Sequence, residues 1–526
     1  MSFALVPAIA ICLLNVNRHT EVPGNMRPMV MDVDHEDENE HNPDKNRNWT
    51  SEEAALFQRE MQQVRNSLKQ AAVQRGIEAY AGGALGGTWV NRGPYNMPGS
   101  FYFTEMDEGT DTVYAITNGH YGGVQFIWKG TLTDDQWTLI TPKHPYRFED
   151  LIVLPNGSGR RVIAALEGGG IMYSDNEGQT WTNATGLPSS LKSTIVNRQD
   201  NNVLYATDGK VVYRSTNLGT SFSSFQTIGS SASYARMYSP RWSSQPGAES
   251  VYLAVDSKFF KLNSQKTSFT QVGTIATGGR IGIGGDNRKL WVTLSNKKWH
   301  VSTNDGQTWA YQHTSNCYYN DISDDMETGH YPGVHPEDPN ILIGGYSNPL
   351  TTRDAGATTN FDANKYWGYY QNSVGNDPKV RVNYHPDIQG SQFFYDKNGD
   401  LLTLRATDGG VFVSYNEWTK TSYPNKSDID GVYYNISLFG KPSQETYRGG
   451  FMYGAKNIDD MTVGTQDQGW QNTRLNTYGN DMLSWDQVGG GDGPCCITGD
   501  GIIGWKYEYF GEGVFSRIQL EIHIKA

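Results

Sequence analysis

Hydrophobic residues in this chain come in short runs separated by glycine and polar turns, a pattern typical of β-strands. One unit recurs: an apolar strand, a glycine turn, a second strand ending in Ser or Thr, and a turn that is often closed by an aromatic residue. The clearest copies are Gly169–Trp181 and Ser302–Trp309, and weaker copies are Ser215–Phe222 and Thr352–Thr358. The closing aromatic residues of successive copies are about 45 residues apart, and an interval of this length suits one four-stranded blade. The pattern therefore predicts an all-β, multi-bladed β-propeller of seven or more blades over residues 85–526.

The closing turn of each unit has a local physical reason to recur. An Asn or Asp side chain at the third position bonds the backbone of the turn, and Gly at the fifth position adopts a positive φ. The hydroxyl and the aromatic ring attach the hairpin to its blade. We therefore expect these turn residues to be structural: Asn176, Gly178, Trp181, Asn217, Gly219, Phe222, Asn304, Gly306, Trp309, Asp354 and Gly356.

The first part of the chain has a different pattern. Residues 1–16 are mostly apolar, too short to span a bilayer, and fit a secretory signal segment; a misassigned start codon is the alternative. Residues 17–49 are polar and charged, which predicts a flexible acidic linker. In residues 50–84 a capping box precedes apolar positions at helical spacing, which predicts one N-terminal α-helix at 51–75 and a lead-in to the strands. We expect no transmembrane segment.

Charge and cysteine content narrow the class of partner. The chain has 43 Lys and Arg residues against 56 Asp and Glu residues, a formal net charge of −13. An acidic chain repels the phosphate backbone, so we expect no nucleic-acid partner. The four cysteines are too few and too scattered for a disulfide framework or a zinc site with closely spaced pairs. We expect no metal and no cofactor.

Several motifs resemble those of Asp-box, or BNR-repeat, propellers, the superfamily of sortilin N-terminal domains and xyloglucan-cleaving two-propeller glycoside hydrolases. The closing turns carry this resemblance over most of residues 100–420, although three of the four clearest have Asn where the family usually has Asp. Val334–Asn340 resembles the linker between blades in sortilin-like propellers. Thr407–Ser414, Gly464–Gly469 and Gly490–Gly493 resemble further turns of these proteins. The resemblance implies the fold and does not choose among its functions.

Propellers bind ligands at the mouth of the central channel, where loops from several blades meet. His385 and Asp387 precede an expected inner strand and resemble a His-x-Asp feature of bacterial relatives. An Asp residue beside glycine also fits a turn-capping role, so each acid has a structural alternative. The candidates for this opening are His385, Asp387, Gln389 and Trp470 for binding, and Asp408, Asp467 and Asp492 for catalysis.

Two functions remain open from the sequence. Glycoside hydrolysis needs one carboxylic acid to protonate the leaving oxygen and a second carboxylate to activate water or attack the sugar. The three candidate Asp residues would supply such a pair, but the Asp-containing strand motifs of the xyloglucan-cleaving enzymes have no match here, and we expect no second propeller. We therefore expect a secreted or cell-surface propeller that binds an extracellular polypeptide or a glycan, a polysaccharide included. A glycoside hydrolase acting on a β-glucan-type polysaccharide is the alternative.

The end of the chain has two interpretations. The sequence stops soon after Arg517, just after what resembles the opening of another blade. We expect a truncated blade with an unpaired strand edge between Asp467 and Arg517, which would promote association with other chains. The alternation of apolar and polar residues over Ile518–Ile524 also fits a closing strand that pairs with Phe101–Thr104.

Overall fold

The structure is a computed structural model that describes most of the chain between residues 99 and 437. The described ranges are 99–117, 125–132, 137–142, 147–166, 169–198, 200–230, 232–241, 250–275, 281–294, 298–314, 332–345, 349–354, 388–419 and 432–437, together with the backbones of six strands between 462 and 521. Within these ranges the helical content is one 3₁₀ turn, η3 (Glu417–Thr419). The expected signal segment, linker and α-helix lie outside the described residues.

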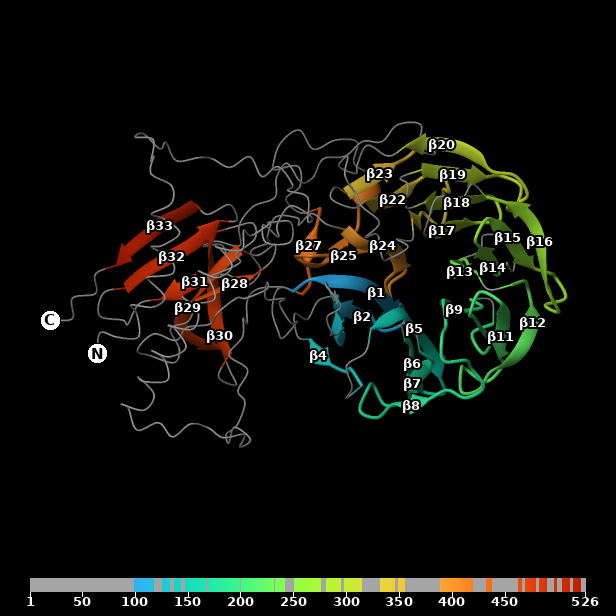
Figure 1. The fold of residues 1–526 in the computed structure, drawn as a ribbon, viewed down its shortest axis with the longest axis horizontal. Helices are drawn as coiled ribbons and strands as arrows, with labels where there is room; N and C mark the ends of the chain where they lie inside the picture. The colour runs from blue at the N-terminus through green and yellow to red at the C-terminus, as the bar shows by residue number, and fades with distance from the viewer. Residues whose placement is uncertain are drawn as a thin grey trace, which may run out of the picture.

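Seven sheets form a closed ring, so the chain contains a seven-bladed β-propeller (Figure 1). The first four blades are β1 (Phe101–Asp107), β2 (Thr112–Thr117), β3 (Ile127–Thr131) and β4 (Thr138–Leu139); β5 (Phe148–Asn156), β6 (Gly159–Leu166), β7 (Ile171–Ser174) and β8 (Thr182–Asn183); β9 (Ser193–Val196), β10 (Leu204–Thr207), β11 (Val211–Ser215) and β12 (Ser223–Thr227); and β13 (Ala235–Tyr238), β14 (Tyr252–Val255), β15 (Lys258–Leu262) and β16 (Phe269–Thr274).

The last three blades complete the ring. They are β17 (Ile281–Asp286), β18 (Lys289–Leu294), β19 (Lys298–Ser302) and β20 (Ala310–Thr314); β21 (Gly333–Val334), β22 (Leu342–Gly345) and β23 (Pro349–Thr352); and β24 (Ile388–Tyr395), β25 (Leu401–Thr407), β26 (Gly410–Ser414) and β27 (Tyr434–Asn435). The first strand of each blade is the innermost and contacts the first strand of the next blade. The prediction of an all-β propeller with at least seven blades is confirmed, although the sixth blade has three strands among the described residues.

The hydrophobic core lies between blades. Each large cluster of buried side chains joins two neighbouring sheets, for example the first with the second and the fourth with the fifth. Strands in the middle of a blade are therefore buried on both faces, as in β10 and β14, where every residue is buried. Outer strands such as β4 and β8 are exposed. This layering explains why the middle strands are continuous apolar runs and the outer ones are polar.

The ring closes through side chains of the first and seventh blades. One core cluster contains residues of both blades, and the indole Nε1 of Trp137 donates to the carbonyl of Ile436 at 2.8 Å. Gln392 Nε2 on β24 donates to the carbonyl of Thr104 on β1 at 3.3 Å. The strand β1 is thus covered by β24 and β25. The alternative interpretation of the chain end, as a strand that pairs with Phe101–Thr104, is not found among the described residues, where Val514–Glu521 pairs with Gly504–Phe510 in a separate sheet.

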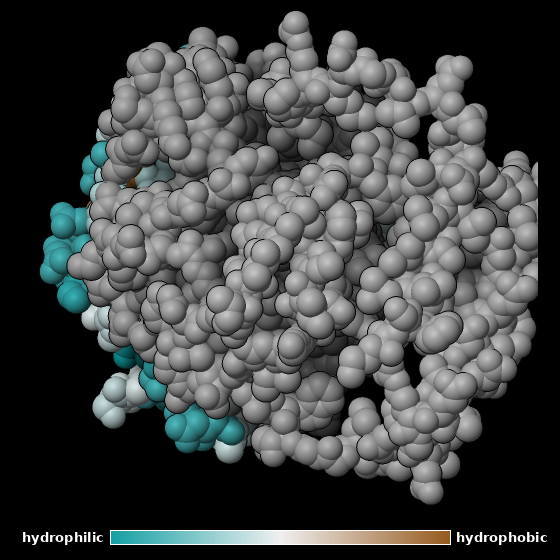
Figure 2. All heavy atoms as spheres, turned by 90° about the vertical axis from the view of Figure 1, so that its left-hand side faces the viewer, coloured by the Kyte–Doolittle hydropathy of each residue, from teal (hydrophilic) through white to brown (hydrophobic). Residues whose placement is uncertain are grey.

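Six further strands follow the ring and form two three-stranded sheets. They are β28 (Thr462–Thr465), β29 (Gly469–Tyr478) and β30 (Met482–Gly489), and β31 (Cys496–Thr498), β32 (Gly504–Phe510) and β33 (Val514–Glu521). Figure 1 shows them, in red, outside the ring. Figure 2 views the molecule from this side, and the described residues visible there are mainly hydrophilic.

The predicted closing turns have a shared set of hydrogen bonds. After β19, the Gly306 N–H donates to Ser302 Oγ and the Thr308 N–H donates to Asn304 Oδ1, each at 2.9 Å. The turns after β7 and β11 repeat these two bonds. Gly306 has a φ of 82°, and a Cβ there would lie 2.4 Å from the ring of Phe259 on the preceding blade. The turn therefore packs against its neighbour as well as closing its own hairpin.

Candidate functional site in the central channel

The innermost strands of all seven blades line one cavity at the centre of the ring. Lining residues come from β1, β5, β9, β13, β17, β21 and β24 and from the segments that follow several of these strands. The cavity has a volume of about 870 Å³, its open mouth included. The space inside the walls that water can occupy is about 110 Å³, which is smaller than the roughly 300–1,000 Å³ of a typical site for a drug-sized ligand.

A buried ion cluster of Glu105, Arg198 and Arg241 crosses this cavity. Arg198 Nη2 lies 3.1 Å and Arg241 Nη2 lies 2.7 Å from Glu105 Oε2. The Arg241 guanidinium also lies 4.6 Å from the centre of the Phe394 ring on β24, a cation–π contact. The two arginines follow β9 and β13, whereas Glu105 and Phe394 belong to β1 and β24 on the other side of the ring. The cluster therefore joins opposite walls of the channel.

Burial in this cluster also changes the pKa of Arg198. Burial and, to a smaller extent, the nearby Arg241 lower the pKa of Arg198 to about 10, against the opposing effect of the Glu105 carboxylate. Arg198 nevertheless keeps its positive charge at neutral pH, because about 10 is still well above 7. Two positive charges therefore share the Glu105 carboxylate, which accepts hydrogen bonds from both.

The other two carboxylates that line the cavity are also paired with arginine. Asp150 on β5 lies 3.7 Å from Arg236 and accepts the Thr194 N–H at 3.2 Å. Asp286 on β17 lies 2.6 Å from Arg288. All three lining carboxylates, Glu105 included, are thus compensated by guanidinium groups of the chain itself.

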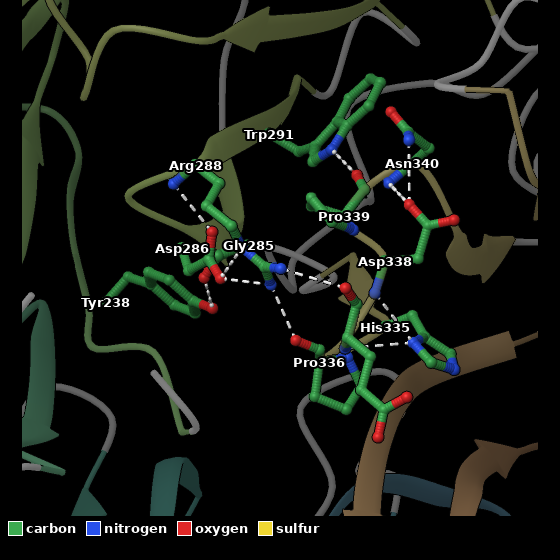
Figure 3. Close-up of polar contacts among 11 residues, drawn as sticks. Tyr238, Gly285, Asp286, Arg288, Trp291, His335, Pro336, Asp338, Pro339 and Asn340 are labelled. Carbon is green, nitrogen blue, oxygen red and sulfur yellow. Dashed lines mark hydrogen bonds and ion pairs between the residues drawn. The ribbon is translucent and has the colours of Figure 1, made fainter. Parts of the chain in front are cut away.

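Figure 3 shows how the Asp286 pair extends to the next blade. Arg288 donates from Nη2 to the Pro336 carbonyl at 2.8 Å and from Nη1 to the Glu337 carbonyl at 3.0 Å. Trp291 Nε1 donates to the Pro339 carbonyl at 3.0 Å. The segment Val334–Asn340 runs from β21 towards β22 in one sheet, so its interpretation as a linker between blades is wrong. It instead receives hydrogen bonds that join the fifth blade to the sixth.

His335 is the second residue of that segment and lines the cavity. Its Nδ1 accepts the N–H groups of Glu337 and Asp338, each at 3.2 Å. Burial lowers the pKa of His335, against the effect of the two neighbouring carboxylates. The imidazole is therefore neutral at pH 7, and its proton is on Nε2 because Nδ1 is an acceptor.

Among the residues predicted from the sequence, Asp408 and Gln389 come together. Asp408 is buried, and its Oδ1 accepts the Ser100 hydroxyl at 2.6 Å and the Gln389 amide at 3.2 Å. Ser100 directly precedes β1, whereas the other two belong to the seventh blade. These contacts place Asp408 at the joint between the first and last blades.

The remaining predicted residues are distributed differently. His385, Asp387, Asp467, Asp492 and Gly356 lie outside the described residues. Trp470 lies in β29 opposite Gly489, in a sheet that is not part of the ring. Asp354 Oδ1 accepts the Thr352 hydroxyl at 3.0 Å.

The sequence reasoning missed the ion cluster. Arg198 and Arg241 each follow the innermost strand of a blade by two or three residues, since β9 ends at Val196 and β13 at Tyr238. Aligning the blades by their inner strands would have placed both arginines at the same end of the channel. Glu105 is a charged residue within a mostly apolar inner strand, which is a second available signal.

Comparison with known proteins gives structural likeness at low identity. No protein-family model and no curated protein matches the chain. A GH74 enzyme of Niastella koreensis is 15% identical over 83% of this chain and 74% of its own, with a TM-score of 0.46. The GH74 xyloglucanase of Xanthomonas campestris is 12% identical over 82% of this chain and 75% of its own, with a TM-score of 0.49. A structure of YCF48 bound to D1 peptide is 14% identical over 63% and 98%, with a TM-score of 0.38.

The described residues provide neither a metal-binding cluster nor a membrane-spanning helix. They contain no group of three or more His, Cys, Asp or Glu side chains placed to hold a metal ion. They also contain no helix with the length and apolar character needed to cross a membrane.

Proposed function

We propose that the chain is a binding propeller whose ligand, an extracellular polypeptide or polysaccharide, occupies the central cavity. The observation that carries this proposal is the convergence of all seven blades on one cavity with polar groups on its wall. A concave site of this kind, built on rigid strands, is suited to holding a ligand. The extracellular location is also a proposal, and it rests on the apolar residues at positions 1–16.

The state of the cavity carboxylates favours binding over hydrolysis. A glycoside hydrolase needs a carboxylic acid that carries a proton and reaches the leaving oxygen, and a second carboxylate that reaches water or the sugar. Glu105, Asp150 and Asp286 are each engaged by arginine side chains of the chain. Their oxygens are therefore occupied by internal contacts.

Hydrolysis of a β-glucan through Asp408, Asp467 and Asp492 is the alternative function. Asp408 is buried and accepts two hydrogen bonds at the joint between blades, which suits a structural role. The other two residues lie outside the described residues. Release of reducing sugar from β-glucans is the activity that tests this alternative.

The experiment combines binding and activity measurements. A glycan array and a peptide array are screened with the full chain, and release of reducing sugar from β-glucans is measured with the same preparation. Gln392→Trp fills the cavity beside β24, and Gln271→Trp makes the same change on the exposed outer strand β16. We expect binding that Gln392→Trp abolishes and Gln271→Trp preserves. Sugar release that disappears in Asp408→Ala would overturn the binding proposal.

A further inference from the structure

We infer that the cavity takes an uncharged, hydroxyl-rich ligand, namely a neutral sugar residue. This inference rests on the proposed function and specifies the chemical class of its ligand. It follows from three properties of the cavity wall: its charges are internally compensated, its neutral polar groups have spare hydrogen-bonding capacity, and it carries aromatic side chains.

The first property disfavours a charged ligand. Glu105 binds both Arg198 and Arg241, the Glu108 carboxyl also interacts electrostatically with these two arginines, and the two lining aspartates bind arginines of their own. An anionic ligand would have to compete with Glu105 for the arginines, and a cationic ligand would have to compete with the arginines for Glu105. Either exchange leaves a buried charge without its partner, which is strongly unfavourable.

The second property favours a neutral polar ligand. Thr194 is fully buried, and its Oγ1 has no hydrogen-bond partner among the described residues. Ser239 Oγ accepts a hydrogen bond from the backbone N–H of Arg198 at 3.2 Å, so the Ser239 hydroxyl proton is available to donate. A buried hydroxyl without a partner is costly, so a ligand that supplies one gains affinity.

Two more neutral groups come from the opposite blades. The protonated Nε2 of His335 is a donor, because its Nδ1 accepts two backbone N–H groups. Gln392 uses its Nε2 to reach the Thr104 carbonyl, which leaves its amide oxygen available as an acceptor. Together with Thr194 and Ser239, these side chains represent four blades, and all of them line the cavity. Hydroxyl groups of a sugar both donate and accept, and so match such a mixed set.

The third property suits a sugar ring, and the position of the ion cluster favours a sugar over a threaded peptide. Phe103, Tyr238 and Phe393 also line the cavity, and aromatic rings pack well against the apolar faces of sugars. The ion cluster crosses the channel, so a chain threaded through the ring would meet it. A peptide entering end-on would bring a charged terminus to a wall whose charges are already paired. A terminal neutral sugar residue brings no charge.

The test compares oligosaccharides of matched length and different charge by isothermal titration calorimetry. Cello-oligosaccharides and malto-oligosaccharides are the neutral probes, oligogalacturonates the acidic probe, chitosan oligosaccharides the basic probe, and short peptides the alternative class. We expect a neutral probe to bind with an affinity that does not change between low and high salt, because no ion pair forms with the ligand. Loss of binding in the Gln392→Trp variant, whose new side chain fills the cavity, would place the bound probe in the cavity.

A pair of variants tests the role of the unpartnered hydroxyl. Thr194→Val keeps the shape and removes the hydroxyl, and we expect it to weaken binding of the neutral probe about tenfold. Thr194→Ser keeps the hydroxyl and is expected to stay within about threefold of the parent chain. Thermal unfolding of both variants verifies that the fold is retained, and a saturating-ligand titration separates weak binding from a smaller folded fraction.

The outcomes separate the two proposals. If an acidic, basic or peptide probe binds in the cavity and its affinity falls with salt, the inference is wrong and the binding function stands. If a neutral probe binds but Thr194→Val has no effect, the inference is also wrong. If no probe and no member of the two arrays binds in the cavity, the proposed function itself fails.

Discussion

The guanidinium of Arg241 on the fourth blade lies 2.7 Å from the carboxylate of Glu105 on the first blade, across the centre of the ring. Both side chains are largely buried. Taking such charges out of water is costly, and the cost is offset only while each charge keeps its partner. The contact thus makes the stability of the ring depend on a single carboxylate in an inner strand.

We expect Glu105→Ala to destabilise the chain by about 3–5 kcal/mol, because it removes the carboxylate to which both Arg198 and Arg241 are hydrogen-bonded. Chemical denaturation of the parent chain and of the Glu105→Ala variant measures the loss in free energy of unfolding. Lys129→Gln is the matched control, because it breaks the more exposed pair of Lys129 with Glu177 and should cost less than about 1 kcal/mol. A loss from Glu105→Ala no larger than the control would show that the buried cluster does not stabilise the ring.

Glu108 gives a pH-dependent prediction at the joint between the first and seventh blades. Burial raises the pKa of Glu108 above its ordinary value of 4.5, and the nearby Arg241 opposes this shift. The folded chain therefore holds the Glu108 proton more tightly than the unfolded chain does. By linkage, this carboxyl favours folding at low pH, and that contribution is lost as the pH rises from 4.5 through the folded pKa.

We expect Glu108→Gln to be more stable than the parent chain at neutral pH, because glutamine carries no charge to desolvate. Its amide oxygen still accepts the Tyr395 N–H, which reaches Glu108 Oε1 at 2.8 Å. Denaturation midpoints measured across the acidic and neutral range should converge towards low pH, where Glu108 is protonated in both states. A constant difference at every pH would contradict the assignment.

The closing turns test whether contact between blades, and not only backbone conformation, selects glycine. Gly306 and Gly157 have positive φ values of 82° and 60°. A Cβ on Gly306 would lie 2.4 Å from Phe259, whereas a Cβ on Gly157 would meet nothing within 4 Å. We expect Gly157→Ala to cost about 1–2 kcal/mol for its conformation, and Gly306→Ala to cost a further 1–3 kcal/mol, roughly, for overpacking. Equal losses in thermal unfolding would contradict the contact argument.

The sequence predicted those features that depend on neighbours in the chain. The closing turns are local, so the bonds of Asn304 to its own turn follow from residues within eight positions. The ion cluster was not predictable in this way, because Glu105, Arg198 and Arg241 meet only after the ring closes. The seventh blade shows the same limit. There η3 follows β26, and its Glu417 forms a fully buried pair with Arg405 on β25, 12 residues away in the sequence.

Asp408 links the closure of the ring to the alternative function. Its Oδ1 accepts the hydroxyl of Ser100 and the amide of Gln389, and the three side chains are buried or nearly so. Replacing Asp408 with alanine removes an acceptor from two buried donors, and a buried donor that loses its acceptor costs about 1–3 kcal/mol. Asparagine keeps an acceptor oxygen and should lose less.

We therefore expect Asp408→Ala to unfold at a lower temperature than Asp408→Asn, and both at a lower temperature than the parent chain. The weakened joint between β1 and β24 should also open more often, because Asp408 supplies one of the polar contacts that join the first and seventh blades. Limited proteolysis reports that opening, and Ser100→Ala should reproduce part of it, because it removes one of the two donors. If Asp408 is instead a hydrolytic residue, asparagine would abolish sugar release while leaving stability and proteolysis unchanged. That pattern would contradict the structural role derived from its contacts.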